Sequence, residues 1–296
     1  MLAERDASFG GAKGLPHESG GEKSRQAVSG LPPRLRYLDV GLRPTCADAV
    51  WIPFHELPDR TNELPPRHER VTICDTGPEA QDAATWLRAA ERDAVTVPAR
   101  VGPPTRGRLW EPNPFLAEIL RKLEPGLGLD LACGGGREAA AMTAAGWEVT
   151  AVDHLPELPE RGATFAHRYL GETAKPIHWV VRNLVRDGMP SGRWDLITLF
   201  FFLDRPLLKA ASAALNHGGS LVVETFTAEH RRRFGKPRRE GLVLQPDELE
   251  ELLPELQVVR AEEFASDQRM TFRYWARNHT KQAPTHPADE GPFGHS

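Results

Sequence analysis

The sequence predicts an α/β protein with two ordered domains, the larger built on a seven-stranded, doubly wound sheet. Two observations carry this prediction. From residue 113 onward, short apolar runs alternate with helical segments, which is typical of parallel strands joined by crossover helices. The last two apolar runs, Leu256–Phe264 and Arg269–Arg277, lie too close together for a crossover, so we expect an antiparallel hairpin.

The composition sets the domain boundaries. The chain of 296 residues contains 26 Gly and 26 Pro, well above average usage, which indicates tails and a linker. Residues 1–34 and 280–296 have no apolar periodicity and are expected to be disordered. A Pro-rich linker is expected over residues 99–112, between domains at 35–98 and 113–279.

Charge and cysteine content exclude several classes of protein. The net charge of −4 gives no whole-chain reason to expect nucleic acid or an anionic membrane as a partner. No apolar run approaches the ~20 residues of a membrane span, and the first residues lack a signal-peptide core. Cys46, Cys74 and Cys133 are too scattered for a disulfide framework or a zinc site. We therefore expect a cytoplasmic protein without a metal site.

The first domain is expected to hold a helix among three short strands. Alanines and Leu87 recur at helical spacing over Glu79–Arg92. The strands are predicted at Arg36–Val40, Val71–Cys74 and Ala94–Val97.

The second domain is expected to hold five strands before the hairpin. These apolar runs, most of which end at polar or turn residues, are Leu127–Ala132, Glu148–Asp153, Ile177–Val185, Asp195–Leu203 and Gly219–Thr225. The predicted helices share a 3.6-residue apolar period and are Pro114–Leu123, Arg137–Ala145, Glu160–Leu170, Leu207–Leu215 and Pro246–Leu253.

A glycine run gives the strongest sign of a binding site. Gly134–Gly136 follow the first strand of the second domain, where open α/β sheets bind ligands and helix N–H groups point at them. Asp153 ends the next strand, where a carboxylate can accept two ribose hydroxyls. A tight turn at the glycines and a solvated or helix-capping Asp153 are the structural alternatives.

A dinucleotide site is the first functional alternative, because Gly134, Gly136 and Ala139 fit a relaxed GxGxxA fingerprint. Asp130 opposes it, since dinucleotide-binding strands usually stay apolar at this point. A carboxylate there suits an amine-bearing ligand. The terminal hairpin is also foreign to the usual dinucleotide fold.

The segments LDLACGGGREA, VTAVDHL and WDLITLFFFLDR, with the closing strand pair, resemble class I S-adenosylmethionine-dependent methyltransferases, most closely the small TehB-like tellurite-resistance type. The resemblance covers about 165 residues and implies S-adenosyl-L-methionine as cofactor. It implies that Asp130, Cys133 and Gly134–Gly136 surround the amino-acid part of the cofactor, that Asp153 holds the ribose, and that Asn183 lies near the adenine. Asn183 stands where the family usually has an Asp, so the charge is lost but an acceptor for the adenine amino group is kept; a turn residue is the alternative there.

No spacing singles out a catalytic residue. Methyl transfer needs mostly proximity and orientation, and a base only where the acceptor is protonated. Asp204, Glu224 and His230 fall near strand ends and are candidates, although each also fits a structural or solvated residue. Phe200–Phe202 are expected to contribute to the wall of an acceptor pocket, with at least one of them in the core because side chains alternate along a strand.

The loop His230–Arg239 carries six Lys or Arg residues beside the expected substrate face. It favours a lid over a small, anionic acceptor, with a solvated loop as the structural alternative. A nucleic-acid acceptor has only this single run and one Phe in its favour.

The first domain resembles the rhodanese-like family through RYLDV, VWIPFHEL and VTICDTG. This resemblance places Cys74 where that family carries sulfur. Glu79 stands where an arginine is usual, and a carboxylate near a thiolate lowers its reactivity. We therefore expect a degenerate, inactive rhodanese-like domain.

The sequence thus predicts an S-adenosylmethionine-dependent methyltransferase that acts on a small-molecule acceptor. The alternatives are a non-catalytic protein that binds a nucleotide-like ligand or a partner, and a sulfurtransferase acting through Cys74. The acceptor and the oligomeric state are not predicted.

Overall fold

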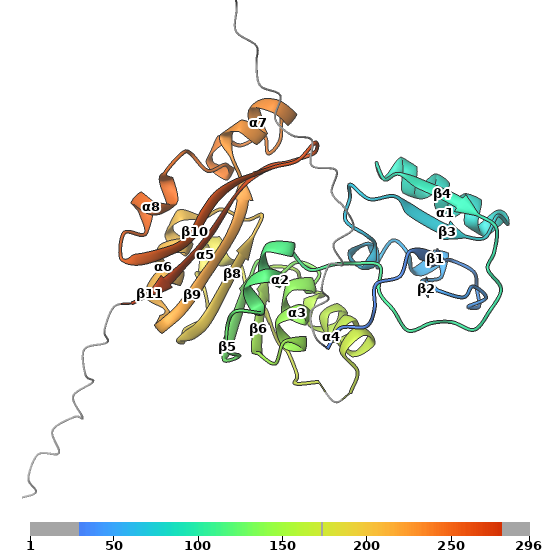
Figure 1. Cartoon of the computed structure of the whole chain (residues 1–296), viewed down its shortest axis with the longest axis horizontal. Coiled ribbons are helices and arrows are strands. Elements are labelled where there is room, and N and C mark those ends of the chain that lie inside the picture. The colour runs from blue at the N-terminus through green and yellow to red at the C-terminus, as the bar shows by residue number, and fades with distance from the viewer. Residues whose placement is uncertain (1–29, 173, 280–296) are drawn as a thin grey trace, which may run out of the picture.

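The computed structural model describes residues 30–172 and 174–279, which form two domains, each built on its own sheet (Figure 1). Residues 1–29 and 280–296, most of the two expected tails, lie outside the described residues.

The first domain is a four-stranded parallel sheet in the order β2-β1-β3-β4. Its elements are β1 (Tyr37–Asp39), β2 (Ala49–Trp51), the 3-10 turns η1 (Phe54–Glu56) and η2 (Thr61–Glu63), β3 (Val71–Cys74), α1 (Pro78–Ala89) and β4 (Ala94–Val97). The predicted bounds of β3 and β4 are confirmed. The sequence prediction missed β2, because three residues are too few to show a period.

The second domain is a seven-stranded sheet in the order β10-β11-β9-β8-β5-β6-β7. β11 runs antiparallel between β9 and β10, so the predicted closing hairpin is confirmed. The strands are β5 (Leu127–Leu131), β6 (Glu148–Asp153), β7 (His178–Val181), β8 (Trp194–Phe200), β9 (Leu215–Phe226), β10 (Leu256–Ala265) and β11 (Met270–Asn278).

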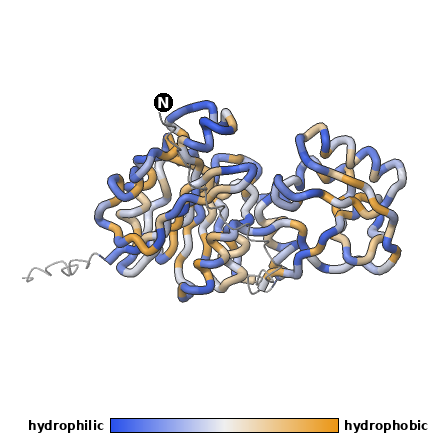
Figure 2. Tube along the Cα trace, turned by 45° about the horizontal axis from the view of Figure 1, so that its top comes forward, coloured by the Kyte–Doolittle hydropathy of each residue, from blue (hydrophilic) through white to orange (hydrophobic). Residues whose placement is uncertain are grey.

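Helices cover both faces of this sheet. On β9, Leu221 and Val223 pack into one core with α5, α6 and α8, while Val222 packs into the other with α2, α3 and α4. Figure 2 shows hydrophobic segments gathered inside each domain. The helices are α2 (Pro114–Leu120), α3 (Arg137–Ala144), α4 (Leu158–Leu170), α5 (Leu184–Asp187), α6 (Arg205–Ala213), α7 (Ala228–Phe234) and α8 (Glu248–Leu252).

Part of the basic run forms a helix, which corrects the prediction of a loop over His230–Arg239. The side chain of Thr227 accepts a hydrogen bond from the backbone N–H of His230 and so begins α7. Gly235, at φ +68°, ends the helix in the left-handed conformation.

The end of the predicted linker is also corrected, because it packs into both domains. Leu109 is buried in the core of the first domain. Trp110 is fully buried in the second domain, where its ring lies 5.0 Å from Phe165 and 5.2 Å from Tyr169, centroid to centroid. The two domains are therefore joined by a packed segment.

None of the helices within the described ranges 30–172 and 174–279 has the length and apolar character needed to cross a membrane.

We expect Trp110→Ala to lower the free energy of unfolding by about 3–5 kcal/mol, because it removes a large buried ring and leaves a cavity. Chemical denaturation followed by fluorescence and circular dichroism measures this change. Val101→Ala is the matched control, since Val101 lies in the same linker and is 88% exposed. Equal stability of the two variants would show that the segment does not join the domains as described.

Candidate functional site

The glycine loop between β5 and α3 has an unusual backbone. Ala132, Gly134 and Gly136 all adopt left-handed conformations, at φ +55°, +53° and +77°. A Cβ atom on Gly134 would meet nothing within 4 Å, so this side of the loop is open to a ligand. A Cβ atom on Gly136 would lie 2.6 Å from the ring of Trp179. The sequence missed Trp179, whose ring also packs against Gly162.

Asp130 is buried on β5 below this loop, with 1% of its surface exposed. Its Oδ1 accepts a hydrogen bond of 2.8 Å from the hydroxyl of Thr198. Its Oδ2 makes no hydrogen bond of normal geometry with the residues that the structure describes, although the nearby Ala139 N–H favours the ionised form and partly offsets the rise in pKa. Burial, and then the nearby carboxylate of Glu138, raise the pKa of Asp130 well above its usual value. A cationic group of a ligand would satisfy this oxygen and favour the ionised form.

Asp153, at the end of β6, also holds the glycine loop in place through hydrogen bonds. Its Oδ2 accepts from the Gly134 N–H at 2.8 Å, and its Oδ1 accepts from the His154 N–H at 2.7 Å. The His154 ring, which the sequence did not single out, places Nδ1 2.8 Å from Oδ1. Of the two carboxylate oxygens, Oδ2 has no second partner among these contacts and keeps a lone pair for a hydroxyl.

A cavity of about 390 Å³ opens at the carboxyl ends of β6 and β8. Asp153 and Asn183 line one part of it, and Phe200, Phe201 and Phe202 line another. All three predicted phenylalanines therefore reach the cavity, and Phe201 does so from a left-handed backbone at φ +57°.

Asn183 has a structural duty besides lining this cavity. Its Oδ1 accepts from the backbone N–H groups of Val185 and Arg186, at 3.2 and 3.0 Å, and so begins α5. Both lone pairs of that oxygen are used. The acceptor that the sequence analysis reserved for an adenine amino group is therefore already committed.

Glu224 is fully buried on β9 in a closed polar network. It accepts from the amide of Asn113 at 2.9 Å and the hydroxyl of Thr271 at 2.8 Å, and it pairs with Arg273 Nε at 3.2 Å. This arrangement makes Glu224 a structural counter-ion and leaves it no access to an acceptor.

The two other base candidates also have structural duties. Asp204 accepts from the Leu207 N–H at 2.8 Å and begins α6. His230 is 6% exposed, and its Nδ1 accepts from the Met270 N–H at 3.1 Å. Burial lowers the pKa of His230.

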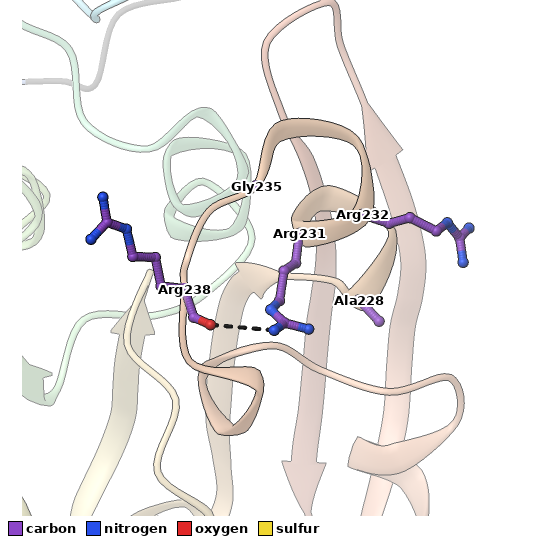
Figure 3. A pocket seen from close by; sticks show the side chains of 5 residues that line it. All are labelled: Ala228, Arg231, Arg232, Gly235 and Arg238. Atoms are coloured by element: carbon purple, nitrogen blue, oxygen red, sulfur yellow. Dashed lines mark hydrogen bonds between the residues drawn. The ribbon is translucent and has the colours of Figure 1, made fainter.

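The arginines of α7 and the following loop line a second cavity, of about 450 Å³. Figure 3 shows Arg232 pointing away from Arg231 and Arg238. Arg231 donates to the backbone oxygen of Arg238 at 3.3 Å, and Arg232 pairs with Glu229. The guanidinium groups do not converge on one point.

The three cysteines are buried thiols. Burial raises the pKa of Cys133, whose side chain packs in the core while its backbone belongs to the glycine loop. Across the ranges 30–172 and 174–279, no cluster of three or more His, Cys, Asp or Glu residues could hold a metal ion.

Comparison with known families gives a match over residues 108–287 to the model described as a methyltransferase domain. Among curated proteins, the uncharacterized protein UNK4.09 of Schizosaccharomyces pombe is 26% identical over 46% of this chain and 52% of its own length. The chain therefore spans about half the length of this relative.

The solved structures to which this chain is similar include two bacterial proteins. TehB from Haemophilus influenzae has a TM-score of 0.48 and 17% identity, over 56% of this chain and 62% of that one. The N-methyltransferase NodS from Bradyrhizobium japonicum, in complex with S-adenosylhomocysteine, has a TM-score of 0.45 and 19% identity, over 55% and 83%.

We expect Glu224→Gln to lower the free energy of unfolding by about 3–5 kcal/mol, because the buried Arg273 loses its close counter-ion. Of the carboxylates that the structure describes near Arg273, Glu262 at 4.0 Å would remain. Chemical denaturation measures the loss. Thr271→Val is the matched control, since it removes one hydroxyl hydrogen bond to the same carboxylate, leaves the ion pair in place and should cost less, about 1.5–3 kcal/mol. A Glu224→Gln protein as stable as the wild type would refute the counter-ion role.

Proposed function

The chain belongs to the methyltransferase domain family, and we propose that its second domain transfers a methyl group from S-adenosyl-L-methionine to a small acceptor. The observation that carries the proposal is the buried, unpartnered Oδ2 of Asp130, below an open glycine loop and one strand away from Asp153. This arrangement offers an anion for an ammonium group and, on the next strand, an acceptor for ribose hydroxyls.

In this proposal, different residues of the site bind different parts of the cofactor. Asp130 holds the ammonium group of the amino-acid part, and the backbone of Cys133–Gly136 approaches the same part closely. Asp153 accepts a ribose hydroxyl through Oδ2. Asn183 contributes a wall of the cavity near the adenine, since its side-chain oxygen is engaged at α5.

The chain contributes chiefly proximity and orientation to the reaction. S-adenosylmethionine, when bound, would supply an electrophilic methyl group on its sulfonium, with S-adenosylhomocysteine as the leaving group. The phenylalanines at the end of β8 form an apolar wall of the cavity, which positions an acceptor and limits water. Because Asp204, Glu224 and His230 all have structural duties, the proposal assigns none of them as a base.

An anionic acceptor is supported by the connection between the cavity and α7. The rings of Phe201 and Phe226 lie 5.4 Å apart, and Phe226 stacks on His230 at 4.3 Å. The helix α7, which carries the arginines, therefore packs against the cavity wall through His230. Nucleic acid stays the alternative acceptor, and ligand binding without catalysis is the alternative for the whole domain.

We further propose that the first domain is rhodanese-like but inactive as a sulfurtransferase. The parallel sheet supports the likeness, and Cys74 ends a strand as expected. Cys74 is fully buried, however, and its backbone oxygen accepts from the Cys46 thiol at 2.8 Å. The next loop N–H groups, of Thr76 and Gly77, are bonded to the Asp75 carboxylate, so they offer no anion site.

We expect Asp130→Asn to weaken S-adenosylmethionine binding at least tenfold, because it removes a charge-assisted hydrogen bond worth about 1.5–3 kcal/mol. In the wild type, the raised pKa of Asp130 means that affinity should increase with pH until the free carboxyl is ionised, then level off. Asp130→Asn should lack this rise. Isothermal titration calorimetry across a pH series measures both effects.

Asp195→Asn is the matched control, because Asp195 lies on the neighbouring strand β8 but bonds to the Leu127 N–H and to Asn216 at the opposite end of the sheet. Its cofactor affinity should equal that of the wild type. A wild-type chain that binds neither S-adenosylmethionine nor S-adenosylhomocysteine at millimolar concentration would refute the proposed function. Binding of both, with no transfer in a screen of labelled cofactor against small acceptors and RNA, would favour the non-catalytic alternative.

We expect replacement of Arg231–Arg233 by alanine to raise the KM for an anionic acceptor about tenfold, while cofactor affinity stays unchanged. The screen that identifies the acceptor supplies the substrate for this steady-state measurement. A loss of cofactor affinity in the variant would contradict the role of α7 in acceptor recognition.

A further inference from the structure

We propose that the first domain acts as a fixed support for the glycine loop, with Asn62 as the positioning residue and Glu63 as its anchor. This inference deepens the proposed function, on which it rests, because it assigns part of the cofactor affinity to residues outside the methyltransferase domain. Asn62 and Glu63 both lie on η2, and Figure 1 shows the first domain on the side of the second where α3 and α4 lie.

The contact itself is a hydrogen bond from the first domain to the backbone of the loop. The side-chain amide of Asn62 donates to the carbonyl oxygen of Gly135 at 3.1 Å. The same peptide unit carries the N–H of Gly136, which donates to the Cys133 carbonyl at 2.9 Å. The peptide plane is therefore held at both ends, once from within the loop and once from the other domain.

Close packing at Gly135 supports the same role. A Cβ atom on Gly135 would lie 2.6 Å from the Asn62 Cβ and 2.8 Å from its Nδ2. Gly135 does not adopt a left-handed conformation, so its own backbone does not demand a glycine. The absence of a side chain at this position is explained by the approach of Asn62.

A buried ionic cluster anchors η2 on α4. Glu63 is 2% exposed and pairs with Arg60 of its own domain at 2.7 Å. The same carboxylate pairs with Arg168 and accepts a hydrogen bond of 2.6 Å from the hydroxyl of Tyr169, both on α4. A carboxylate so enclosed by two cations and a phenol holds the domain in one position, since separation would leave buried charges unpaired.

A second contact between the two domains, an aromatic cluster, lies next to the ionic cluster of Glu63. The ring of Tyr169 belongs to the same aromatic cluster as Phe165 and Trp110, the last residue of the packed segment between the domains. The first domain therefore reaches the second through both η2 and the chain itself. Asn62 is held in place without depending on its own hydrogen bond.

Two measurements on the full chain test the inference. In Asn62→Asp, which has the same shape but brings a carboxylate to the Gly135 carbonyl, we expect about five- to tenfold weaker binding of S-adenosylhomocysteine by calorimetry. We also expect faster hydrogen–deuterium exchange of the backbone amides at residues 133–136 in the ligand-free protein. Thr61→Ala, an exposed neighbour on η2, is the control and should match the wild type in both.

A double-mutant cycle isolates the contact from general effects on stability. Gly135→Ala alone should weaken binding at least tenfold, because its Cβ collides with Asn62. In a chain that also carries Asn62→Gly, which removes all three colliding atoms, the same substitution should cost at least threefold less affinity than it does in the wild-type background. Equal losses in both backgrounds would overturn the inference. Thermal unfolding of each variant separates a shifted loop from a misfolded chain.

The two proposals fail in different ways. If the wild type binds no S-adenosylhomocysteine, the proposed function is wrong, and the exchange rates of the loop in Asn62→Asp still decide the inference. If the wild type binds and Asn62→Asp neither weakens binding nor changes loop exchange, the support by the first domain is wrong and the proposed function stands.

Discussion

The proposed site of the second domain depends on a buried carboxyl oxygen, Oδ2 of Asp130, that makes no hydrogen bond of normal geometry with any residue in the ranges 30–172 and 174–279. Asp130 lies on the interior strand β5, between β6 and β8, with helices over both faces of the sheet. Burying an unpaired acidic oxygen costs free energy, and this cost supports the proposal that a cationic group of a ligand pairs with Asp130. The open glycine loop above it and Asp153 on the next strand are arranged where such a partner would lie.

Much of this arrangement could be predicted from local patterns in the sequence. The bounds of β3, β4 and β6 match the structure, because each is a short apolar run with clear turn residues at its ends. The antiparallel hairpin followed from the short distance between the last two runs alone. The glycine loop could be predicted because the apolar pattern changes across it, from that of a strand before the glycines to that of a helix after them.

The rest depends on contacts between residues far apart in the chain. Asn113 and Glu224 are separated by 111 residues, and no local pattern shows that Glu224 is a counter-ion buried with Arg273. Asn62 and Gly135 are separated by 73 residues, so their hydrogen bond between the domains could not be predicted from the sequence either. Thr227 and Gly235 did carry a local signal for α7, a cap and a C-terminal glycine, which the prediction of a loop over His230–Arg239 overlooked.

The most direct test of the account is the number of protons released when S-adenosylhomocysteine binds to the full chain. Titrations in two buffers of different ionisation enthalpy, from about pH 5 to about pH 8, give this number. Because burial raises the pKa of Asp130 and a bound ammonium group would lower it again, the account predicts proton release. The release should be largest where the free carboxyl titrates and absent in Asp130→Asn. Binding without proton release in the wild type, or with the same release in Asp130→Asn, would contradict the role of Asp130.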